Sequence, residues 1–142
     1  MTSAPPTWQQ LRDILVNART VAVVGFTDKP DRPNHTVPAY LQSVGYRIIP
    51  VNPKLDEALG EKAYASLRDV PGPIDVVQIF RPSEAVPPIV EDAIAKGARV
   101  VWMQPGIVNV EAAVRAEAAG LQVVMDMCMR ATHRALRADG AL

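Results

Sequence analysis

The sequence predicts an α/β fold: a Rossmann-like, doubly wound sheet of about five parallel strands with helices on both faces. The first observation is that short β-prone apolar runs alternate with helical segments of about ten residues. The second is that these runs are nearly continuous, as in strands buried on both faces. The third is Gly25, which directly follows the first run, where a sharp strand-to-helix turn is needed. For the five main strands we expect the order 3-2-1-4-5.

The composition is typical of a globular protein, and we expect residues 1–142 to form a single domain. Apolar residues make up 49% and charged residues 21%, and no apolar run approaches the roughly 20 residues that a bilayer span needs. Met1–Pro6 is too short and too polar for a signal peptide. Fifteen acidic residues balance fifteen basic ones, so no net charge attracts nucleic acid or a membrane. The single cysteine excludes an internal disulfide and is consistent with a cytoplasmic location.

The first half of the chain predicts two helices and two strands. In order, we expect a helix over 7–18, the first strand over 21–24, a helix from about 35 to 44 and the second strand over 46–51. Thr7 and Gln10 fit a capping box, and this first helix is expected to cover the sheet edge. Asn34 is the expected N-cap of the next helix, which Gly45 ends.

The second half continues the alternation. After a short possible strand near 62–65, we expect the third main strand over 74–80, a helix over 83–96, the fourth strand over 100–103, a helix over 110–119, the fifth strand over 121–125 and a closing helix over 128–137. Gly97 and Gly120 are placed to end two of these helices.

Ligands of doubly wound sheets bind beyond the carboxyl ends of the strands, where the strand order reverses. This rule selects five loops as candidate binding elements: 25–36, 52–54, 80–83, 104–108 and 126–128. A helix N-terminus after the first loop would favour an anion, because its N–H groups and its dipole attract negative charge. An ordinary strand-to-helix turn without a ligand fits this loop equally well.

The loops lack the marks of a typical nicotinamide site. Gly25 stands alone where such a site has G-x-G-x-x-G, and no acid follows the second strand to hold a ribose diol. Lys54 at that position suits a phosphorylated ribose instead. With Lys29, Arg32 and Arg81 it could surround a ligand with several phosphates, although each cation alone also fits a solvated surface.

Four stretches carry a resemblance to a known family: VAVVGFTDKPDRPNHTVPAYLQSVGYRIIPVNPK, IDVVQIFRP, VVWMQPGIVNVEAA and VVMDMC. In this order and spacing, the chain resembles the CoA-binding domain family, in a stand-alone bacterial form similar to the N-terminal domain of the succinyl-CoA synthetase α subunit. The resemblance covers nearly the whole chain after the first helix.

The resemblance implies that coenzyme A, free or acylated, is the ligand. It implies that the first loop holds the diphosphate, 52–54 meets the adenosine and its 3′-phosphate, 80–82 lines the adenine side, and 104–107 lies near the pantetheine arm. The candidate binding residues are Gly25, Phe26, Thr27, Lys29, Arg32, Asn34, His35, Thr36, Asn52, Pro53, Lys54, Phe80, Arg81, Pro82, Gln104, Pro105, Gly106, Ile107 and Cys128.

No residue pattern supports catalysis or a metal site, and the chain is too short for the further domain on which synthetase chemistry depends. His35 fits binding or capping better than general-base work, and His133 fits a helix end or the surface. Cys128 is either a buried core cysteine or a thiol close to the CoA sulfur. We therefore expect a CoA-binding protein that is not an enzyme on its own. An NADP-type enzyme and an interaction module with a vestigial cleft remain alternatives, and a protein partner or homo-oligomer is possible but not indicated.

Overall fold

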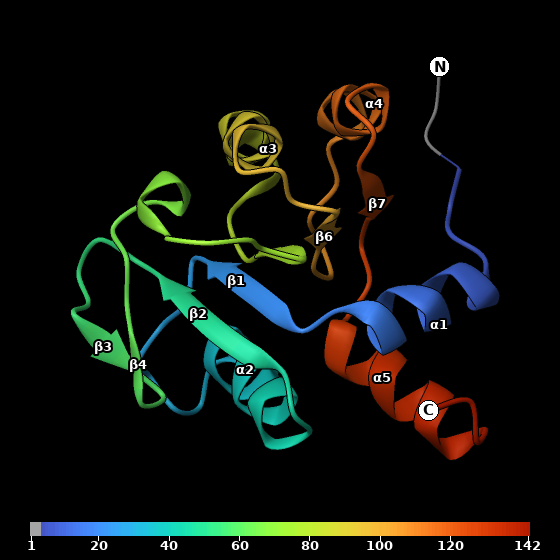
Figure 1. Cartoon of the computed structure of the whole chain (residues 1–142), viewed down its shortest axis with the longest axis horizontal. Coiled ribbons are helices and arrows are strands. Elements are labelled where there is room, and N and C mark those ends of the chain that lie inside the picture. Colours follow the sequence, from blue (N-terminus) through green and yellow to red (C-terminus); the bar gives the residue numbers. More distant parts are fainter. Residues whose placement is uncertain (1–3) are drawn as a thin grey trace.

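A five-stranded parallel sheet forms the centre of the fold, as the sequence predicts. The structure, a computed structural model, describes residues 4–142 (Figure 1). In spatial order the strands are β2 (Arg47–Val51), β1 (Thr20–Val24), β5 (Val76–Ile79), β6 (Val100–Met103) and β7 (Gln122–Val124), and each neighbouring pair is parallel. The chain runs from β1 out to β2 and then returns to the other side of β1. The strand order therefore reverses at β1, which is the position that favours a ligand site.

The place outside β2 is filled by a single parallel bridge instead of a full strand. Tyr64 donates its N–H to Pro50 O at 3.0 Å and accepts from Asn52 N at 2.9 Å, and it forms a parallel bridge with Val51. With this bridge counted as a strand, the spatial order reads 3-2-1-4-5-6, which has the expected pattern; without it, the five main strands have the order 2-1-3-4-5. The strand that the sequence analysis counted as third, β5, lies beside β1. The chain before Tyr64 cannot lengthen the bridge, because it turns back as a hairpin of β3 (Glu57–Ala58) and β4 (Glu61–Lys62).

Helices cover both faces of the sheet (Figure 1). α1 (Trp8–Asn17), α2 (Pro33–Ser43) and α5 (Met129–Ala138) lie on one face, and α3 (Val86–Ala95) and α4 (Val110–Ala118) lie on the other. Alternate residues of each strand pack into the two cores, because successive side chains point to opposite faces of the sheet. Val21 and Val23 belong to the α2 and α5 side, whereas Ala22 belongs to the α3 and α4 side.

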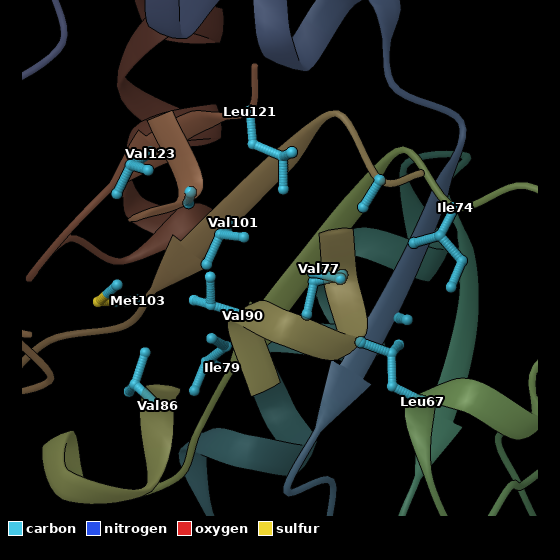
Figure 2. Packing of buried hydrophobic residues seen from close by; sticks show 14 of the residues in the cluster. Leu67, Ile74, Val77, Ile79, Val86, Val90, Val101, Met103, Leu121 and Val123 are labelled. Atoms are coloured by element: carbon cyan, nitrogen blue, oxygen red, sulfur yellow. The ribbon is translucent and has the colours of Figure 1, made fainter. Parts of the chain in front are cut away.

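Figure 2 shows the core on the α3 and α4 side, where Val77 and Ile79 of β5 and Val101 of β6 pack with Val86 and Val90 of α3. All five side chains are fully buried. This packing fixes the height of α3 above the carboxyl ends of the strands, and so positions one wall of the site.

The position of α1 differs from the expectation. Leu11, Ile14 and Leu15 are buried in the core on the α2 and α5 side, so α1 covers a sheet face and not the sheet edge. Its stripe of apolar residues is wide enough for a face, because Ile14 is buried together with Leu11 and Leu15. The capping box of Thr7 and Gln10 is present as predicted.

The start of α2 also differs from the expectation. The helix begins at Pro33, with Arg32 as its N-cap residue, so Asn34 is not the N-cap. Proline is favoured at the first helical position because its φ is already helical and its missing N–H would have no helical partner there. Two 3₁₀ turns complete the described elements: η1 (Leu67–Asp69) precedes β5, and η2 (Ser83–Ala85) leads into α3. Within residues 4–142, no helix is both long and apolar enough to cross a membrane.

A buried histidine joins α5 to α2. His133 Nδ1 lies 2.8 Å from the Tyr40 hydroxyl, and its ring meets the rings of Tyr40 and Tyr46 edge-on. Only 7% of His133 is exposed, so this residue belongs to the core and not to the surface position expected from the sequence. Burial lowers the pKa of His133, and the charge of Arg137 lowers it further.

We expect the stability of the protein to fall as the pH drops from about 7.5 to about 5.5. The folded pKa of His133 lies below that of the unfolded chain, about 6.5, so the unfolded state binds more protons in this window. The contribution of neutral His133 to stability is complete above the unfolded pKa, and it is lost as the pH falls through the lower, folded pKa. Urea unfolding at several pH values measures the effect, and His133→Gln should flatten the pH dependence. Equal slopes for the two proteins would contradict this role of His133.

Candidate functional site

A cleft of about 680 Å³ lies at the carboxyl ends of β1, β2 and β5, where the strand order reverses. Nine of the predicted residues line it: Gly25, Phe26, Thr27, Asn34, Asn52, Pro53, Lys54, Phe80 and Arg81. They come from three of the five loops selected from the sequence. The first, second and third main strands therefore bring their loops together as the switch-point rule requires.

Gly25 allows the tight turn at the floor of the cleft. Its φ is +89°, and a Cβ atom there would lie 3.1 Å from Phe80 O and 3.3 Å from Arg81 Cδ. Its N–H donates to Val51 O at 3.1 Å, so the turn is also tied to the end of β2. Glycine is therefore needed at this position for two reasons: the backbone has a conformation that L-residues rarely adopt, and the chain lies close to the end of β5.

Three side chains contact the backbone carbonyl groups of the first loop. Asn34 Nδ2 donates to Gly25 O at 2.7 Å, and Asn52 Nδ2 donates to Phe26 O at 2.8 Å. His35 Nδ1 lies 2.8 Å from Thr27 O, and because a carbonyl only accepts, Nδ1 is the protonated nitrogen. Three consecutive carbonyl groups are therefore occupied by protein donors, and the loop has a fixed shape without any ligand.

This arrangement explains two residues that the sequence analysis placed in the site. The Phe26 side chain is only 1% exposed and packs 5.3 Å from the His35 ring, measured between ring centroids. Phe26 therefore belongs to the core, and its side chain does not face the cleft as a binding group. His35 orients the loop through Thr27 and is engaged in that contact, which fits positioning better than general-base chemistry.

The charged groups around the cleft are mostly cationic. Lys54 and Arg81 are exposed and line the cleft, whereas the exposed Lys29 and Arg32 do not. Asp92 also lines it, but its carboxylate accepts from Arg68 Nε at 2.6 Å. Asn52, at the end of β2, caps its own turn by accepting the Lys54 N–H at 2.8 Å. Among the described lining residues, the lip of the cleft at β2 therefore presents an ammonium group and no carboxylate.

The remaining predicted residues lie outside this cleft. They are Lys29, Arg32, His35 and Thr36 at the start of α2, Pro82, Gln104, Pro105, Gly106 and Ile107 at the ends of β5 and β6, and Cys128 before α5. The loops after β6 and β7 are joined to each other, because Gly106 N donates to Asp126 Oδ1 at 2.7 Å. Cys128 is half-buried and packs against the core on the α2 and α5 side.

The sequence analysis missed one wall of the cleft. Ala65, Ser66 and Leu67 come from the segment before β5, and Ala85, Pro88, Ile89 and Asp92 come from η2 and α3. The switch-point rule considers only loops that directly follow strands, so it does not select either segment. A signal for the first was available in the short possible strand near 62–65, which places its end beside β2.

A comparison with family models shows the family of the chain. A model described as a CoA binding domain matches residues 19–134, which include β1 to β7 and most of α5. The chain belongs to this CoA-binding domain family. The resemblance seen in the sequence is thereby confirmed, and membership of the family supports a CoA-related binding role.

Two relatives have about the same length as this chain. The uncharacterized protein YneT of Bacillus subtilis is 44% identical over 128 residues, which cover 90% of this chain and 95% of YneT. A solved structure of a hypothetical protein from Pyrococcus horikoshii is 40% identical, with a TM-score of 0.90, and the match covers 96% of this chain and 99% of that one. The Rossmann-like fold is therefore shown by a close structural relative.

Larger relatives contain a similar segment. The ADP-forming acetate–CoA ligase of Methanocaldococcus jannaschii is 32% identical over 81 residues, which make up 57% of this chain but only 12% of the ligase. This CoA-binding domain chain thus matches a small part of an enzyme whose other parts have no counterpart in the alignment.

We expect Gly25→Ala to destabilise the protein more than Gly72→Ala. Both glycines have positive φ, +89° and +79°, so both variants should lose roughly 1–2 kcal/mol from the left-handed backbone. Only at Gly25 does the new methyl group meet Phe80 O, whereas nothing lies within 4 Å at Gly72. The crowding should add about 1 kcal/mol or more to the loss. Urea unfolding of the three proteins measures the difference, and equal losses would show that the approach to Phe80 is not limiting.

Proposed function

We propose that the protein binds coenzyme A, free or acylated, in the cleft at the carboxyl ends of β1, β2 and β5. The observation that carries this proposal is the lip formed by Asn52, Pro53 and Lys54, which offers a cation to a phosphorylated ribose where a nicotinamide site usually offers an acid. Membership of the CoA-binding domain family supports the same ligand.

In this proposal the adenosine half of the ligand occupies the cleft. The 3′-phosphate lies beside Lys54, and the adenine lies between Phe80 and the wall formed by Ser66 and Ile89. The diphosphate follows the loop from Gly25 to Thr27 toward the start of α2, where Lys29 and Arg32 add positive charge. A volume of about 680 Å³ suits a nucleotide-sized group, with the rest of a longer ligand extending outside.

We further propose that the protein acts by binding and does not ligate CoA to an acid on its own. Asp92 is paired with Arg68, and His35 is engaged with Thr27 O, so neither group is set up as an acid or base over the cleft. Similarity to YneT along nearly all of its length fits a stand-alone binding role, as a sensor or with a partner protein.

The second candidate function is an NADP-dependent enzyme, because Lys54 would suit the 2′-phosphate of NADP as well. The lone glycine of the first loop speaks against it. We expect calorimetric titration to show tighter binding of CoA than of NADP or NAD. Binding of NADP at least as tight as that of CoA would overturn the proposal, and the absorbance and mass of small molecules released from the purified protein give an independent answer.

We expect Lys54→Ala to weaken CoA binding by about tenfold, because a hydrogen bond to a charged group contributes roughly 1.5–3 kcal/mol. The loss should shrink at high salt, since Lys54 is exposed and ions screen its contact. Dephospho-CoA lacks the 3′-phosphate, so it should bind the wild type and Lys54→Ala almost equally. Calorimetry with both ligands and both proteins gives the coupling free energy, expected to be at least about 1 kcal/mol.

A matched control for this cycle is Arg47→Ala. Arg47 is exposed at the opposite end of β2, so its removal lowers the net charge equally but far from the lip. This variant should leave both affinities nearly unchanged. Equal losses of CoA and dephospho-CoA affinity in Lys54→Ala would instead assign the 3′-phosphate to another cation, such as Arg81 or Arg32.

A further inference from the structure

A second groove lies between the carboxyl-terminal ends of α1 and α2 and the side of α5. Two hollows of about 330 and 320 Å³ share Val44, His133 and Leu142 in their walls, so they form one groove. Arg19 and Tyr46 also line it, and these residues directly precede β1 and β2. The groove therefore lies at the amino-terminal ends of the strands, opposite the nucleotide cleft. Its size suits a small molecule.

One half of the groove is apolar. Leu15, Val16, Val44 and Tyr46 contribute to its wall, and the Tyr46 hydroxyl donates to Leu15 O, so that polar group is already engaged. Of the five large apolar side chains that are exposed within residues 4–142, two, Val16 and Leu142, line this groove. An aliphatic group that covered them would remove apolar surface from water, which favours binding.

The other half of the groove is cationic. Arg137 and His133 line it, and among the described lining residues none is Asp or Glu. Within residues 4–142, neither Arg137 nor Arg19 forms an ion pair, and the main-chain carboxylate of Leu142 forms none either. The Arg19 guanidinium donates to two carbonyl groups at the end of α1, whereas the exposed Arg137 is left with its full charge. This half of the groove thus favours an anion.

His133 adds a second donor to the cationic half. Its Nδ1 atom lies 2.8 Å from the Tyr40 hydroxyl. Its Nε2 atom makes no hydrogen bond within residues 4–142, yet the buried side-chain atoms without a partner there consist of Gln78 Oε1 alone, so Nε2 keeps contact with solvent. Because His133 lines both hollows, this contact lies in the groove. When Tyr40 donates to Nδ1, Nε2 carries the proton and donates into the groove.

We propose that this groove binds a small aliphatic carboxylate. The aliphatic chain lies against Val16 and Val44, and the carboxylate accepts from Arg137 and from His133 Nε2. A ligand with an ammonium group would meet like charge at the same place, and a ligand without a chain would leave the apolar half uncovered. The inference does not depend on the proposed function, because the groove and the nucleotide cleft share no lining residue.

The test is titration of the protein with octanoate at constant pH and ionic strength, followed through the imidazole proton signals in NMR spectra. The chain has two histidines, and His133→Gln identifies which signals belong to each. We expect the His133 signals to shift and to saturate, while those of His35 beside the cleft stay in place. Octylamine has the same chain with an ammonium group and should leave both unchanged. Acetate has no chain and should bind at least about tenfold more weakly than octanoate.

Arg137→Gln and Arg134→Gln form a matched pair of variants. Both residues are exposed on α5, but only Arg137 lines the groove. We expect Arg137→Gln to weaken octanoate binding by about threefold to fivefold, as is typical of an exposed charged contact. Arg134→Gln removes the same charge and should change the affinity by less than about twofold. Unchanged His35 signals show that each variant is folded.

Three results would refute the inference: no saturable shift at His133, equal losses in the two arginine variants, or octylamine binding as tightly as octanoate. Displacement of octanoate by CoA would also refute it, because the carboxylate would then occupy the nucleotide cleft. The proposed function fails separately, if CoA does not bind while octanoate still shifts the His133 signals.

Discussion

The approach of Gly25 to the Phe80 carbonyl is the contact on which the rest of the site depends. A side chain at this position would come within 3.1 Å of that oxygen, so the ends of β1 and β5 could not stay as close as they are. With the turn in place, Asn34 and Asn52 reach the carbonyls of Gly25 and Phe26 from two other elements. One missing Cβ therefore permits a loop whose shape is then fixed by side chains from α2 and from the end of β2.

In the proposed site, the same loop has its shape before any ligand binds. Its carbonyl groups are engaged with protein donors, so the negative ends of these dipoles are withheld from the cleft. The positive groups, Lys54 and Arg81, are left at the rim, where water keeps them solvated. An anionic ligand thus meets little repulsion and displaces few protein contacts, which lowers the cost of ordering on binding.

Much of the fold and three sides of the cleft were predictable from local sequence. The apolar runs gave the parallel strands, and the residues after β1, β2 and β5 gave three sides of the cleft, because strand ends of a parallel sheet meet at one edge. The remaining wall was missed, because the switch-point rule considers only the loops that directly follow the main strands. Ser66 reaches the cleft through the pairing of Tyr64 with Val51 of β2, and the short possible strand near 62–65 was its one sequence signal. The roles of Asn34 and His133 were also missed. The helix α2 begins at Pro33, so Asn34 lies inside the helix and is not its N-cap. The burial of His133 depends on the packing of α5 against α2.

The contacts of α5 have a consequence for the dynamics of the fold. Its first N–H, on Met129, holds Gln104, and its middle, at His133, holds Tyr40 of α2. The helix that closes the sheet is therefore connected at once to the loop after β6 and to the helix that supports the first loop. Local unfolding of α5 would release both, so the slow amide protons of α2 and α5 should exchange with deuterium as one cooperative unit, more slowly when the cleft is filled.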